Sequence, residues 1–75
     1  MDANLLSSHV ADEENLERQI QSRLGTRVKD LRIEVRAGGL VIHGRAATYH
    51  AKQLAQHAAM ELAGVPVLVN DIDVY

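Results

Sequence analysis

The chain of 75 residues is long enough for one small domain and too short for two. It has no cysteine, so neither a disulfide framework nor a thiolate metal site can form. Its formal net charge of −2 lacks the basic excess of a general nucleic-acid-binding domain, so no nucleic-acid partner is expected.

The beginning of the chain shows no targeting pattern. No stretch approaches the ~18 apolar residues of a membrane span, and Met1 to His9 lack the basic and apolar regions of a signal peptide. Residues 1–11 have no sustained period and are expected to form a flexible N-terminal lead-in to a single domain at residues 12–75. These features leave the compartment open.

A first helix is predicted from Asp12 to the residue before Gly25. Acidic residues at its start suit the positive end of the helix dipole, and glycine favours a helix end. One apolar stripe, with a residue every four positions, consists of Leu16, Ile20 and Leu24. Residues 26–30 are expected to be a polar connector.

Residues 32–44 predict a β-hairpin. Two alternating runs flank Gly38 and Gly39, and a two-residue hairpin turn needs a positive φ that glycine adopts without steric cost. The predicted inward-facing residues are Leu31, Ile33, Val35, Leu40 and Ile42. Gly44 is expected to end the hairpin on that face, under the helices, where a side chain would be overpacked.

The rest of the chain predicts a second helix and a third strand. Thr48 is the expected N-cap of a helix that runs to about Ala63, and Gly64 is its expected stop. The stripe that would face the sheet is Ala51, Leu54, Ala55, Ala58, Ala59 and Leu62. After Pro66, a strand would place Leu68, Ile72 and Val74 inward. Asn70 interrupts this face and is expected to mark a bulge or to bond to a nearby turn.

The predicted fold is α+β, in the order αββαβ. A helix between the second and third strands returns the chain to its starting end, so these two strands run parallel. Only one face of each strand is consistently apolar. We therefore expect a small three-stranded mixed sheet with two helices packed on one face.

No residue pattern predicts catalysis, a metal site or a cofactor. His50 and His57 are seven residues apart, and the resulting ~10 Å is too far for one metal ion to bridge. Asp71 and Asp73 share a strand face and are expected to pair with arginines rather than to act as acid and base. The pair Gly38 and Gly39 joins two strands and leads into no helix, so it is not a phosphate loop.

Two surfaces are candidate binding sites. The first is the uncovered face of the sheet, with Val41, His43, Arg45, Val67, Val69 and Tyr75. Exposed β-branched residues there favour association with a protein partner or with a second copy. The second is a basic patch for an anionic lipid or acidic partner, with Arg18, Arg23, Arg27, Lys29, Arg32 and Arg36. Each such residue contributes only ~1 kcal/mol at an anionic surface, so weak and salt-sensitive membrane binding is expected.

Residues 13–75 resemble the BON domain, a small module named for bacterial osmotically induced periplasmic proteins and nodulation proteins. The family has a glycine turn followed by a strand that ends in glycine, which corresponds here to residues 38–44. Its later helix, Gly-Val pair and alternating strand correspond to Ala59, Leu62, Gly64, Val65, Leu68, Asn70, Ile72 and Val74. His43 and Pro66 depart from the residues that the family usually has there.

The resemblance implies a non-enzymatic binding module with an αββαβ fold, proposed to attach to phospholipid membranes or envelope partners. It also implies a place in the cell envelope or periplasm, with the cytoplasm as the alternative because no signal peptide is seen. The alternative function is a structural accessory domain that associates with a protein, or with itself, through the open sheet face. The residues expected to be structural are Gly38, Gly39, Gly44, Gly64 and Asn70.

Overall fold

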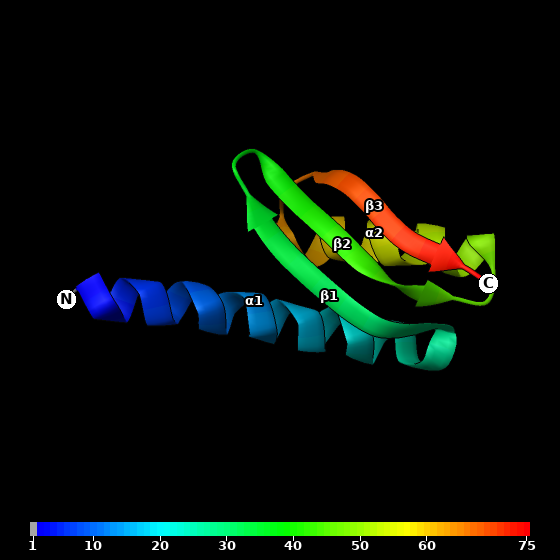
Figure 1. The fold of residues 1–75 in the computed structure, drawn as a ribbon, viewed down its shortest axis with the longest axis horizontal. Coiled ribbons are helices and arrows are strands. Elements are labelled where there is room, and N and C mark those ends of the chain that lie inside the picture. The colour runs from blue at the N-terminus through cyan, green and yellow to red at the C-terminus, as the bar shows by residue number, and fades with distance from the viewer. Residues whose placement is uncertain (1) are drawn as a thin grey trace.

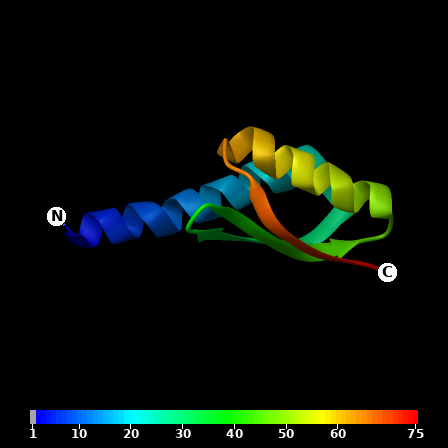
Figure 2. The same cartoon turned by 90° about the horizontal axis from the view of Figure 1, so that it is seen from above.

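The computed structural model describes residues 2–75, with side chains from Glu13 onward. The elements in chain order are α1 (Asp2–Leu24), the 3-10 helix η1 (Gly25–Arg27), β1 (Val28–Arg36), β2 (Gly39–Ala46), α2 (Tyr49–Ala63) and β3 (Val67–Val74). The central strand β2 pairs antiparallel with β1 and parallel with β3. Both helices lie on the same side of the sheet (Figures 1 and 2). The predicted αββαβ fold with a mixed sheet is confirmed.

The helix α1 begins at Asp2, ten residues before the predicted start at Asp12. Its first turns extend past the end of the sheet (Figure 1). Acidic residues mark a favourable place for a helix start, but they do not prevent the helix from beginning earlier. A flexible lead-in was predicted at residues 1–11. The structure describes the backbone of residues 2–11 as part of α1, but it describes neither their side chains nor Met1. The flexibility of this segment stays a prediction.

The helix α2 has the predicted bounds and the predicted caps. The Thr48 hydroxyl oxygen accepts a hydrogen bond from the Ala51 N–H at 3.0 Å. Gly64 has φ +71°, and its N–H donates to the Met60 carbonyl at 2.9 Å. The alanines of the predicted stripe are buried, while Leu54 and Leu62 are partly buried against the core. Small side chains therefore let α2 approach the sheet closely.

The core contains aliphatic and alanine side chains only, among the described residues. Its larger members are Ile20, Leu24, Val28, Leu31, Ile33, Leu40, Ile42 and Ile72. They come from α1 and all three strands, so the core lies between the two helices and the sheet.

No helix in the described part of the chain is long and apolar enough to cross a membrane.

The hairpin turn differs from the prediction by one residue. The turn residues are Ala37 and Gly38, because Arg36 is already paired with Gly39. Gly38 has φ +90°, a conformation that favours glycine. Gly39 instead lies under the chain that enters β3: a Cβ there would be 2.3 Å from the Pro66 carbonyl oxygen. Gly39 is therefore required for a close backbone approach and not for the turn.

A bulge in β3 reverses part of the predicted inward face. Leu40 is opposite Val67 and Val41 is opposite Val69, so Leu68 is an extra residue between them. Val67 consequently packs against the core, whereas Leu68 is 50% exposed. The predicted orientations of Val67 and Leu68 are therefore wrong: Val67 was expected on the open face and Leu68 inward.

At the other end of β3 the predicted inward face is only partly buried. Ile72 is 1% exposed, as predicted. Val74 was also predicted to face inward, but it lies at the end of the strand and is 44% exposed.

A second irregularity lies in β1, between Lys29 and Arg32. Asp30 has φ +56° there, so the predicted connector belongs partly to the strand. Gly44 faces this irregularity: a Cβ on it would be 3.1 Å from both the Lys29 carbonyl oxygen and Val28 Cγ1. The crowding predicted at Gly44 thus comes from β1 and not from the helices, and β2 continues past Gly44 to Ala46.

Candidate functional site

The side of the sheet opposite the helices is uncovered (Figure 2), and we call it the open face. Strand register sets its side chains in three rows that run from β1 through β2 to β3. The rows are Lys29, Arg45 and Asp73; Arg32, His43 and Asp71; and Glu34, Val41 and Val69. The β1 side of two rows is basic and the β3 side of the same rows is acidic.

His43 lies at the centre of the open face, between two carboxylates on neighbouring strands. Its Nε2 is 2.5 Å from a carboxylate oxygen of Glu34, and its Nδ1 is 3.2 Å from one of Asp71. Arg36 donates to the other carboxylate oxygen of Glu34 at 2.8 Å. Because carboxylates only accept hydrogen bonds, both ring nitrogens must carry protons to satisfy this arrangement.

The pKa values in this network move in opposite directions. The hydrogen bond to Glu34, and then the one to Asp71, raise the pKa of His43 above its ordinary value of 6.5. Hydrogen bonds from His43 and then Arg36 lower the pKa of Glu34 below 4.5. The charged form of His43 therefore stabilises the fold fully below about pH 6.5, and this stabilisation is lost as the pH rises through the raised pKa of His43. The charged form of Glu34 stabilises the fold above about pH 4.5, and this stabilisation is lost as the pH falls through the lowered pKa of Glu34.

We expect the melting temperature of the wild-type protein to fall between pH 6 and pH 9 by more than that of the His43→Gln variant. The difference should be a few degrees at most, because the three side chains are substantially exposed. Thermal melts followed by circular dichroism at both pH values measure it. His57→Gln, an exposed histidine of α2 outside the network, is the control and should behave as wild type.

Apolar side chains accompany the charges on the open face. Val69 is 51% exposed and lies beside the partly exposed Val41. Tyr75 is 61% exposed, and the Arg45 guanidinium lies over its ring, 5.1 Å from the centroid. Five of the six residues predicted for this face are thus gathered on it. Val67 is the exception, since it packs against the core.

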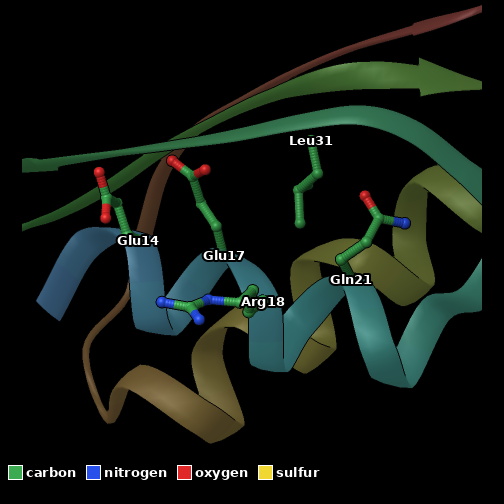
Figure 3. A pocket seen from close by; sticks show the side chains of 5 residues that line it. All are labelled: Glu14, Glu17, Arg18, Gln21 and Leu31. Carbon is green, nitrogen blue, oxygen red and sulfur yellow. The ribbon is translucent and has the colours of Figure 1, made fainter. Parts of the chain in front are cut away.

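The outer edge of β1 is covered by side chains of α1. The carboxylates of Glu13 and Glu17 accept hydrogen bonds from the backbone N–H groups of Val35 and Ile33, at 2.9 and 3.0 Å. Gln21 donates to the Val28 carbonyl oxygen at 2.7 Å. Figure 3 shows Glu17 and Gln21 reaching from α1 toward β1. This contact was not predicted from the sequence, although a polar residue every fourth position beside an apolar stripe was a visible signal.

Asn70 closes part of the opposite edge, on β3. Its side-chain amide donates to the Lys52 carbonyl and to the Gln56 side chain, and its oxygen accepts from the Ile72 N–H at 3.3 Å. Asn70 was expected to mark a bulge or to bond to a nearby turn, but its bonds go to α2 and to its own strand. Its structural role stays a prediction. Because side chains of α1 occupy backbone groups of β1, pairing with another strand is disfavoured at that edge.

The predicted basic patch is divided between two sides of the molecule. Lys29, Arg32 and Arg36 belong to the sheet, whereas Arg18, Arg23 and Arg27 belong to α1 and η1. Arg23 pairs with Glu61 of α2 at 2.5 Å, and Arg36 pairs with Glu34. Figure 3 shows Arg18 lying along α1 and not reaching the sheet. These six residues therefore do not form one surface.

Two hollows of the described structure lie beside α1. One of about 410 Å³ lies between α1 and β1, and its polar residues Glu17 and Gln21 already bind the backbone of β1. Another, of about 380 Å³, lies between α1, the hairpin and the end of α2, and is mainly apolar. No group of three or more His, Asp or Glu side chains in the described part of the chain could hold a metal ion.

Comparison with known protein families gives a match over most of the chain. The family model described as BON domain matches residues 12–74, which is most of the chain. No curated protein and no solved structure matches the chain.

Proposed function

Because the chain belongs to the BON domain family, a family of non-catalytic modules, we propose that it is a binding module that docks a protein partner on its open face. The observation that carries this proposal is the open face itself. It combines half-exposed apolar side chains with charges of both signs, and no element of the described structure covers it. Exposed apolar patches rimmed by charges are typical of surfaces that bind proteins.

The covered edge of β1 supports the same proposal. Hydrogen-bonding groups at this edge are occupied by Glu13, Glu17 and Gln21. A partner strand would have to displace these bonds before it could extend the sheet. Docking on the face displaces none of them.

Lipid attachment is the weaker candidate. Arg18, Arg23 and Arg27 lie apart from the basic residues of the sheet, and Arg23 is already paired. Three basic residues near an anionic membrane supply only ~3 kcal/mol, from which the aspartates of the open face subtract. Attachment to neutral lipid would need a large apolar surface, and the exposed apolar residues of the open face are interspersed with charges.

Site-specific photo-crosslinking in the cells that make the protein tests the proposal. A photoreactive phenylalanine analogue replaces Val69 on the open face or, as the control, Gln53 on the outer side of α2. We expect a protein adduct from position 69 and none from position 53. Lipid adducts alone, or equal protein adducts from both positions, would contradict docking on the open face.

A further inference from the structure

We infer that the open face of this chain docks against the open face of a second copy. The inference rests on the proposed function and names the partner. Its basis is the division of charge across the sheet: Lys29 and Arg32 lie on β1, whereas Asp71 and Asp73 lie on β3. A surface with a basic side and an acidic side can be complementary to itself.

Only one of the two simple twofold arrangements matches these charges. If the axis runs along β2 between two facing sheets, β1 of each copy lies over β3 of the other. The strand register then sets Arg32 over Asp71 of the second copy and Lys29 over Asp73. An axis across the strands would lay β1 over β1 and β3 over β3, so Asp71 and Asp73 would face a strand with no basic residue. Charge therefore selects the first arrangement.

These four residues are also the freest on the face to make new ion pairs. Lys29, Arg32 and Asp73 form no ion pair within the described part of the chain. Asp71 contacts only His43, at 3.2 Å, and remains 65% exposed. Arg45 and His43 of the central strand would meet the same residues of the second copy near the axis, but they are already paired with Asp30 and Glu34. Arg36 is also paired with Glu34.

The same arrangement covers the exposed apolar side chains. Val41 lies on the central strand, next to the axis, and would meet Val41 of the second copy. Val69 and Tyr75, which are about half exposed, would be covered by the facing sheet. Facing sheets pack ~10 Å apart, which lets aliphatic side chains touch and long basic side chains reach carboxylates.

The size of the sheet limits the strength of this contact. Three strands of eight or nine residues make a face of roughly 14 by 26 Å, so two copies bury on the order of 700 Å² together. Stable interfaces bury about 1,200 Å² or more. We therefore expect a weak dimer that depends on concentration and is further weakened by salt.

Charge reversal measured by analytical ultracentrifugation tests the inference. The protein is studied from about 10 μM to about 1 mM, a range suited to a weak interface. The basic-side variant carries Lys29→Glu and Arg32→Glu, and the acidic-side variant carries Asp71→Lys and Asp73→Lys. Each variant alone should dimerise at least about tenfold more weakly than wild type, because both reversed residues then meet like charges in each half of the dimer.

Mixing the two variants in equal amounts should restore dimerisation. In the mixed dimer the introduced glutamates meet the introduced lysines, and the native pairs remain at the other half of the interface. The control carries Arg18→Glu and Arg27→Glu, which change the net charge by the same amount outside the open face, and should dimerise as wild type does. Recovery on mixing also shows that both variants are folded.

Three results would overturn the inference: a wild-type protein that is monomeric over the whole range, no recovery on mixing, or equal weakening by the control. A monomeric chain that still forms protein crosslinks through position 69 would leave the proposed function standing.

Discussion

Gly39→Ala should destabilise the fold by about 3 kcal/mol, a large part of the roughly 4 to 11 kcal/mol expected for a domain of this length. The added Cβ would lie 2.3 Å from the Pro66 carbonyl oxygen, which accepts the hydrogen bond of the Leu40 N–H that joins β2 to the entry of β3. A backbone oxygen held by a hydrogen bond cannot move aside as a flexible side chain can. The melting temperature should fall by more than about 10 °C.

Gly25→Ala is the matched control for this prediction. Gly25 has φ +62°, and a Cβ there would meet nothing within 4 Å. The same chemical change therefore adds conformational strain of about 1 kcal/mol without a collision. Both substitutions restrict the unfolded chain equally, so the difference between the two melts isolates the steric cost. If the two variants lost equal stability, the chain around Pro66 that enters β3 would have to shift away from the added Cβ at little cost in free energy.

The fold could be predicted because each element has its own periodic signal. Helical spacing of Leu16, Ile20 and Leu24, strand alternation on both sides of the hairpin, and a cap at each end of α2 do not depend on distant contacts. The order of these elements then favours a mixed sheet with both helices on one side. The αββαβ arrangement follows from local patterns alone.

The two bulges could not be predicted from those patterns. A bulge adds one unpaired residue, and the alternation on either side still looks regular in the sequence. At Leu68 this one residue reversed the faces assigned to Val67 and Leu68. At Asp30 it placed the polar connector inside a strand. Rows of residues across the sheet depend on both bulges, so the division of charge on the open face required the structure.

Contacts between elements were the other part that sequence analysis missed. Glu13, at the start of the predicted helix, was assigned to the helix dipole, and Glu17 was given no contact. The hydrogen bonds of both residues to the edge of β1 depend on where α1 lies. Asn70 was recognised as an interruption, yet its partners on α2 are distant in sequence. The basic residues looked clustered because they are close in sequence, and the fold distributes them over two sides.

Gly44→Val should also destabilise the fold strongly, by about 2 to 3 kcal/mol, whereas His43→Ala should change the melting temperature much less. A Cβ at Gly44 would already be 3.1 Å from the Lys29 carbonyl oxygen and from Val28 Cγ1, and valine adds two more methyl groups. Val28 is fully buried and Lys29 contributes a backbone atom, so neither can withdraw without disturbing β1. His43, by contrast, loses only ion pairs between exposed side chains.

Thermal and urea melts of these two variants, with Gly44→Ala between them, measure the difference. The alanine variant should lose less than the valine variant, because its single methyl group needs a shift of only a few tenths of an ångström. If Gly44→Val and His43→Ala had the same melting temperature, the irregular segment of β1 around Asp30 would have to open at no cost in free energy. The strand register at the end of the hairpin would then not be the one that sets Lys29 beside Arg45.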